Sequence, residues 1–129
     1  MRYMMLVKHS ENQSNPPKAL MDAITEIAAE AAKKGNMLGS GGLAPTAQSV
    51  RVRVSGGQLR VIDGPFTEAK EVIGGYAQFE FKSKEEAIQS AVEFMELHRK
   101  HWPGWEGETE VRQLFGPEDA PQGCPPPAV

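Results

Sequence analysis

The opening segment constrains the fold of this chain most, because it predicts a β-strand with two apolar faces. Over residues 2–8, apolar side chains occupy both of the alternating positions of a strand rather than one of them. The side chains expected on one face are Tyr3, Met5 and Val7, and those expected on the other are Met4 and Leu6. Such a strand is typical of the centre of a sheet that is covered on both sides. The rest of the chain must therefore supply or recruit cover for two faces.

The segments that follow predict a succession of helices and strands. A helix over 17–34 begins at Pro17, where a missing N–H costs nothing, and ends before Gly35, a residue typical of a left-handed C-cap. Ser83 and Glu86 form an S-x-x-E capping box, which predicts the start of a second helix. The expected strands lie at 2–8, 37–43, 50–54, 59–62, 74–82 and 109–115, and a glycine-containing turn joins the third of them to the fourth.

Without the hairpin made by the third and fourth strands, this order is βαββαβ. It predicts an α+β fold of the ferredoxin-like class with an inserted β-hairpin. Right-handed crossovers place both helices on one face of the sheet, so the other face is left bare. We therefore expect a homodimer in which the bare faces of two copies pack together. Tyr76, Gln78 and Glu80 share a polar face of their strand, which predicts that part of the enclosed space holds a small polar ligand.

Composition narrows the classes of function. The 129 residues fit one domain, which we place at 1–116, and the proline-rich segment 117–129 is expected to be a disordered tail. A net charge of −3 with interspersed signs argues against a direct nucleic-acid partner. No stretch is long and apolar enough to predict a membrane span. A lone cysteine, Cys124, and the lack of a recognisable signal peptide predict a protein of the reducing cytoplasm.

One run of residues resembles a known family. DGPFTEAKE at 63–71, followed by GGY at 74–76, is similar to the signature of the DGPF branch of the YCII-related proteins. The opening MRYMML and the sequence EVR at 110–112 also resemble that family, so the similarity extends from residue 1 to about residue 115. The resemblance implies a ferredoxin-like, dimeric α+β barrel. It implies no particular reaction, because the family is largely uncharacterised.

The resemblance also implies two kinds of role. Some members accompany extracytoplasmic-function sigma factors, which implies a regulatory or stress-linked role. Others in the wider YCII group are suspected enzymes with a His–Asp pair whose histidine lies on the first helix. The helix predicted here at 17–34 contains no histidine, so that pair cannot be carried over and an acid–base pair must be built differently.

Asp63 and His9 are the candidate catalytic residues. Asp63 closes a predicted strand directly before Gly64, and a carboxylate held there beside an apolar cavity suits a general acid or base. The alternative is that Asp63 serves the turn alone, because Asp-Gly-Pro is also favourable turn chemistry. His9 follows the first strand, and an imidazole that meets Asp63 would form a proton-transfer pair at neutral pH.

Five further residues are candidates for ligand binding. Ser40 and Gly42 belong to a glycine-rich run, which is either a weak strand packed close to another backbone or a cradle of exposed N–H groups. Phe66 either plugs the core or lines the cavity. Glu71 either directs a carboxylate into the cavity or lies in a solvated loop. Tyr76 belongs to the polar strand face that we expect to border the cavity.

The region after the second helix combines histidine with tryptophan. His98 lies on the apolar stripe of that helix and is expected to be a hydrogen-bonded core residue. His98 and His101 make a His-x-x-His step without a carboxylate or cysteine at a recognised spacing, so no metal is expected, and no cofactor. Trp102 and Trp105 cap the barrel, wall a pocket or join a dimer rim.

These observations predict a protein that binds a small polar molecule in a dimer cavity, with acid–base catalysis by Asp63 and His9. The alternative is a non-enzymatic module that senses a ligand or binds a partner, linked to transcriptional regulation of the sigma-factor type.

Overall fold

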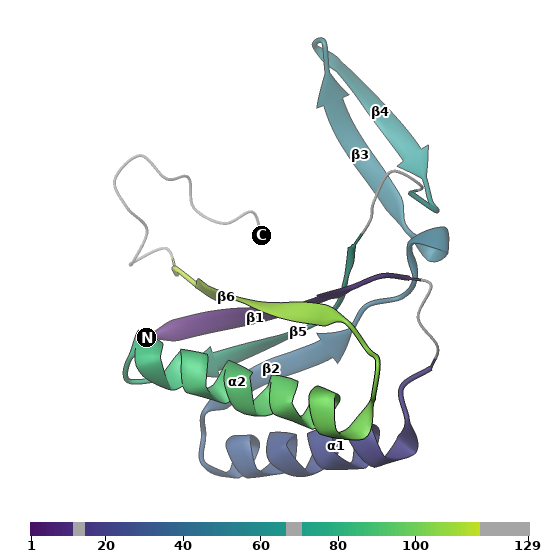
Figure 1. The fold of residues 1–129 in the computed structure, drawn as a ribbon. Helices are drawn as coiled ribbons and strands as arrows, with labels where there is room; N and C mark the ends of the chain where they lie inside the picture. The colour runs from purple at the N-terminus through teal and green to yellow at the C-terminus, as the bar shows by residue number, and fades with distance from the viewer. Residues whose placement is uncertain (12–14, 67–70, 117–129) are drawn as a thin grey trace.

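The computed structural model describes residues 1–11, 15–66 and 71–116. Over these residues the chain forms a four-stranded sheet with two helices on one face, and a two-stranded ribbon that rises on the other side (Figure 1). The elements are β1 (Arg2–His9), α1 (Lys18–Lys33), β2 (Met37–Gly42), the 3-10 helix η1 (Thr46–Gln48), β3 (Val50–Ser55), β4 (Gln58–Asp63), β5 (Val72–Glu80), α2 (Lys84–His101) and β6 (Gly107–Gln113). The tail expected at 117–129, with Cys124, lies outside the described residues.

The strands of the main sheet follow the order β2-β5-β1-β6, and every neighbouring pair is antiparallel. β1 lies between β5 and β6, so the strand with two apolar faces occupies the interior of the sheet, as its sequence predicts. Met5 stands opposite Ala77 of β5 and Val111 of β6. The predicted α+β class is confirmed in these terms: two helices and antiparallel sheets over the described residues.

The hydrophobic core lies between the sheet and the helices. Tyr3 and Met5 are two residues apart on β1, so both side chains point toward the helices, and both are buried. Phe79 of β5 stands opposite Tyr3 and packs in one cluster with Met5 and with Ala91 of α2. Leu20 of α1 is buried almost completely. No helix of the described residues is both long and apolar enough to cross a membrane.

The helix ends follow local signals, with one difference. α1 begins after Pro17 and is followed by Gly35, whose φ of +79° is the left-handed conformation expected there. Ser83 accepts a hydrogen bond from the backbone N–H of Glu86 at 3.2 Å, as in a capping box. The Glu86 carboxylate, however, accepts from the backbone N–H of Lys82 at 2.7 Å, one residue before the cap. The reciprocal bond of the box is therefore displaced by one residue.

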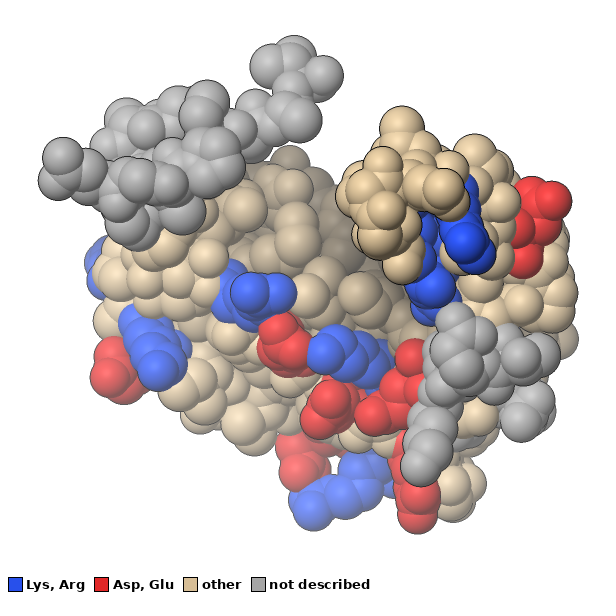
Figure 2. Space-filling view, turned by 90° about the horizontal axis from the view of Figure 1, so that it is seen from above, with Lys and Arg blue, Asp and Glu red and all other residues tan. Residues whose placement is uncertain are grey.

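The side of the sheet turned away from the helices, here named the open face, carries a mixture of side chains. It consists of the residues that alternate with the core positions: Met4, Leu6, Lys8, Tyr76, Gln78, Glu80, Glu110 and Arg112. In the register of the sheet, Leu6 stands between Tyr76 of β5 and Glu110 of β6. Both helices lie on the opposite side, and Figure 2 looks onto the open face from above.

Candidate functional site

The corner after β4 is fixed by a backbone contact that tolerates no side chain. The N–H of Gly64 donates to the carbonyl of Ser49 at 2.8 Å, and the Gly64–Pro65 peptide bond is cis. A Cβ on Gly64 would lie 1.6 Å from the carbonyl oxygen of Thr46, so only glycine fits against η1. Asp63, directly before this corner, is exposed, and no side chain of the described residues hydrogen-bonds or ion-pairs with its carboxylate.

A carboxylate that the sequence analysis did not single out joins the end of β1 to the same corner. Glu11 accepts hydrogen bonds from the backbone N–H of Thr46 at 2.7 Å and from the Thr46 hydroxyl at 2.5 Å. These two bonds hold the pKa of Glu11 below its usual value, with a smaller contribution from the charge of His9. The polar segment around Glu11 carries no local signal for this contact, because Thr46 lies 35 residues away.

His9 lies on the helix side of the sheet. Alternation along β1 places its side chain with Met5, away from the open face. Its Nδ1 donates to the carbonyl of Ser10 at 2.9 Å, so in the neutral ring Nε2 is the acceptor nitrogen. A Cβ on Gly74 would lie 2.1 Å from that Nε2, so the ring rests on the glycine. Within the described residues, no hydrogen bond or ion pair joins His9 to Asp63.

The open face carries the aromatic ring of Tyr76 and a row of ion-paired side chains. The ring of Tyr76 lies over Gly41 of β2, where an added Cβ would meet the ring at 3.1 Å. Glu110 accepts from Lys8 Nζ at 2.5 Å and lies 3.3 Å from Arg112 Nε. The hydrogen bond to Glu110 raises the pKa of Lys8 and lowers that of Glu110, so both groups stay charged. Lysines, arginines and carboxylates gather along this side of the molecule in Figure 2.

The remaining predicted site residues occupy different surroundings. Ser40 is exposed and stands opposite the core residue Ala77, so its side chain shares the helix side rather than the Tyr76 side. Gly42 is exposed at the end of β2. Phe66 is buried, and the guanidinium of Arg51 lies 3.7 Å from its ring centroid. Glu71 is exposed, and its charge adds to the rise in the pKa of Lys8.

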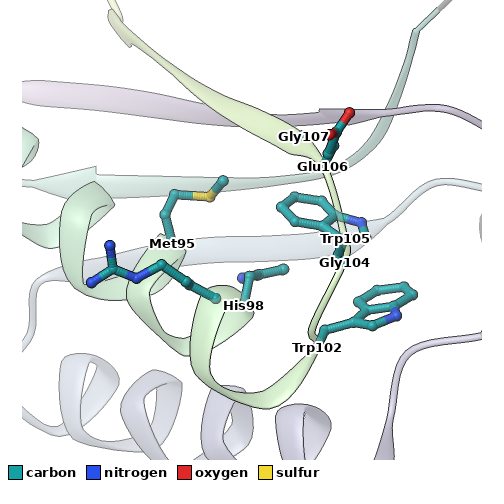
Figure 3. A pocket seen from close by; sticks show the side chains of 8 residues that line it. Met95, His98, Trp102, Gly104, Trp105, Glu106 and Gly107 are labelled. Carbon is teal, nitrogen blue, oxygen red and sulfur yellow. The ribbon is translucent and has the colours of Figure 1, made fainter.

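Both tryptophans stand around a hollow at the end of α2 (Figure 3). His98 is buried, and its Nδ1 donates to the carbonyl of Phe94 at 3.0 Å, as expected of a core histidine. Burial lowers its pKa, so the ring is neutral near pH 7. Trp105 packs on His98 with ring centroids 4.6 Å apart, and Trp102 stacks on Trp105 at 5.8 Å. The hollow has a volume of about 350 Å³.

The polar side chains of the candidate site are hydrogen-bond donors and acceptors that lie on both sides of the sheet. In the described residues no group of three or more His, Cys, Asp or Glu side chains is arranged to hold a metal ion. The titratable and hydroxyl groups fall into two sets on opposite sides of the sheet. Tyr76, Lys8 and Glu110 belong to the open face, whereas His9 and His98 belong to the helix side.

Comparison with known proteins identifies the family. None of the curated proteins matches the chain. The family description of the YCII-related domain matches residues 1–94, which is well over half of the 129 residues and includes β1 through most of α2. The chain therefore belongs to the family of YCII-related domain proteins.

Proposed function

We propose that this protein binds a small polar molecule on the open face, in a space that a second copy of the chain closes. The observation that carries the proposal is the composition of that face. The Tyr76 ring is seated over Gly41, and the Lys8–Glu110 pair lies on the same side. An apolar floor flanked by a few placed polar groups is typical of small-molecule sites. Leu6, which stands between Tyr76 and Glu110, is only half-buried, and this favours a second copy of the chain that covers it.

The fold supports a finer assignment, which is part of the same proposal. The order β2-β5-β1-β6 with both helices on one face agrees with a ferredoxin-like topology. Packing two such sheets through their open faces would make a dimeric α+β barrel. The DGPFTEAKE run at 63–71 supports placement in the DGPF branch of the family.

We further propose that Asp63 supplies acid–base chemistry beside the open face, and that His9, on the helix side of the sheet, is a separate proton-transfer group that does not contact a molecule bound to the open face. Support for Asp63 comes from the rigid corner behind it, where Gly64 is fixed against Thr46. Support for His9 comes from its Nε2, the ring nitrogen that does not bond to Ser10 and that lies beside Gly74. Each group is therefore tested by itself rather than as a dyad.

Amide NMR tests the binding part of the proposal. The probes are four small polar compounds: lactate, malate, glycine and glutamate. We expect at least one of them to shift amide signals of β1, β5 and β6, and Tyr76→Phe and Gln78→Ala to reduce those shifts. Gln89→Ala, on the exposed side of α2, is the matched control. Shifts confined to the helix side, or none with any probe, would overturn the assignment of the site.

The same samples separate an enzyme from a binding module. Proton spectra recorded over hours show whether a bound probe is converted. If conversion occurs, Asp63→Asn should stop it while leaving the amide shifts and the melting temperature unchanged. Binding without conversion would favour a ligand-sensing module. Loss of fold in Asp63→Asn would assign Asp63 to the turn alone.

A further inference from the structure

The β3–β4 ribbon has one face made entirely of exposed aliphatic side chains, apart from the residue at its base. In the register of the ribbon, Val52 stands opposite Val61 and Val54 opposite Leu59, so these side chains share a face. We name this face the ribbon apolar face. Its members and their exposed fractions are Val50 at 56%, Val52 at 69%, Val54 at 71%, Leu59 at 74% and Val61 at 71%.

The opposite face of the ribbon differs sharply in character. It carries Arg53 and Arg60, which stand directly opposite each other, and Arg51, which lies over Phe66. Its one aliphatic residue, Ile62, stands opposite Arg51 near the base. The three arginines are thus kept away from the ribbon apolar face, whose one charged residue, Asp63, lies at its base. A strand that only met water would have no reason to sort its residues in this way, because scattered single hydrophobic residues are what solvent-exposed surfaces normally show.

Within the part of the chain that the structure describes, the ribbon has little support beyond its base. Its sheet consists of β3 and β4 alone, and a two-stranded hairpin by itself is marginally stable in water. Within the described residues its anchorage is at the base, where Gly64 bonds to Ser49 and Phe66 packs under Arg51. Contiguous exposed apolar surface of this kind marks an interaction site.

The position of the ribbon identifies its occupant. The ribbon rises on the side of the sheet that carries the open face, so a molecule that covers the open face lies beside the ribbon (Figures 1 and 2). Six-residue strands reach about 20 Å, comparable with the width of a four-stranded sheet. A second copy brings the same apolar face around a two-fold axis, and such faces are self-complementary.

We propose that the ribbon apolar face packs against a second copy of this chain and acts as an arm of the dimer. The inference deepens the proposed function and rests on its dimer. Asp63 stands opposite Val50 at the base of the same face. The second copy would therefore exclude water from one side of the candidate catalytic carboxylate, and the site would be incomplete in a single chain.

Sedimentation equilibrium of the full chain tests this proposal with three variants of the ribbon apolar face, one control and one variant of the open face. Val61→Lys and Leu59→Lys each place a charge on the ribbon apolar face and should raise the dimer dissociation constant about tenfold or more. Gln58→Lys adds the same charge at the turn and should leave the constant within about twofold. Val52→Ser makes a milder change on the same face. Circular dichroism verifies the fold of each variant. Leu6→Lys tests the open face separately.

The outcomes distinguish the ribbon from the sheet. A wild-type dimer that Val61→Lys and Leu59→Lys weaken, and Gln58→Lys does not, supports the arm. A dimer that responds to Leu6→Lys but to no ribbon variant overturns the arm and leaves the proposed cavity standing. A dimer that responds to the ribbon variants but not to Leu6→Lys supports the arm and overturns the sheet-to-sheet cavity. A monomeric wild-type chain overturns both.

Discussion

The ring of Tyr76 lies across Gly41 of the neighbouring strand: a Cβ at Gly41 would stand 3.1 Å from Tyr76 Cε1 and 3.2 Å from its hydroxyl oxygen. These distances are tighter than ordinary van der Waals contact, so the glycine provides the seat of the phenol ring. The glycine-rich run in β2 therefore serves the approach of a side chain at this position. It places an aromatic hydroxyl on the open face.

Gly41→Val is expected to displace Tyr76 from this seat. Overpacking at the contact should lower the free energy of unfolding by about 1 kcal/mol and weaken any probe that binds the open face. Gly39→Val is the matched control, since a Cβ there meets nothing within 4 Å. Thermal unfolding and amide NMR measure the two effects. Equal behaviour of the two variants would show that the ring does not depend on the glycine.

Gly64→Ala is expected to be strongly destabilising. The new methyl group would collide with the carbonyl of Thr46, which is backbone and cannot rotate away. We expect a loss of roughly 1–3 kcal/mol or more in the free energy of unfolding, measured with urea. Gly39→Ala should stay within about 0.5 kcal/mol of the wild type. A Gly64→Ala protein as stable as this control would contradict the close approach of the corner to η1.

His98 is expected to titrate below its usual pKa of 6.5 because it is buried. The unfolded chain then binds a proton that the folded chain does not, so stability rises with pH from the lowered pKa up to 6.5 and is constant above it. The charge of His9 also lowers the pKa of His98, so His9→Gln should raise it part of the way back. Proton NMR of the imidazole C–H signals measures this, and His101→Gln serves as the control. An unchanged His98 titration in His9→Gln would mean that the two rings are not electrostatically coupled.

Glu11 should contribute stability that disappears in acid. Its pKa in the folded chain is held below 4.5 by the hydrogen bonds from Thr46, so the contribution is present above pH 4.5 and is lost as the pH falls through the lowered value. Glu11→Gln should therefore flatten the acid limb of a plot of stability against pH. Glu30→Gln, on the exposed side of α1, is the comparison and should leave that limb in place.

Local sequence patterns predicted the helices and strands better than they predicted which strands pair with each other. Pro17, Gly35 and the turn glycines mark helix and hairpin ends because they act through backbone conformation alone. β6 was expected at 109–115 but runs from Gly107 to Gln113, since Gly107 pairs with His9 across the sheet. That pairing joins residues far apart in sequence, and no local periodicity reports it.

The same distinction between local patterns and long-range pairing applies to the candidate site. The sequence marks Asp63 as the end of a strand and Tyr76 as a member of a polar face, and the structure places both there. The contact of Glu11 with Thr46 and the position of His9 on the helix side depend on how β1 is registered with its neighbours. These features depend on contacts between residues that are distant in sequence, so local sequence patterns do not predict them.

Association with a second copy is the claim on which the cavity, the arm and the site all depend. Sedimentation equilibrium of the wild-type chain at tens of micromolar tests it most directly. The account predicts a mass twice the 14.1 kDa of one chain, falling toward a single chain in Leu6→Lys. A well-folded species of 14.1 kDa throughout that range would contradict it.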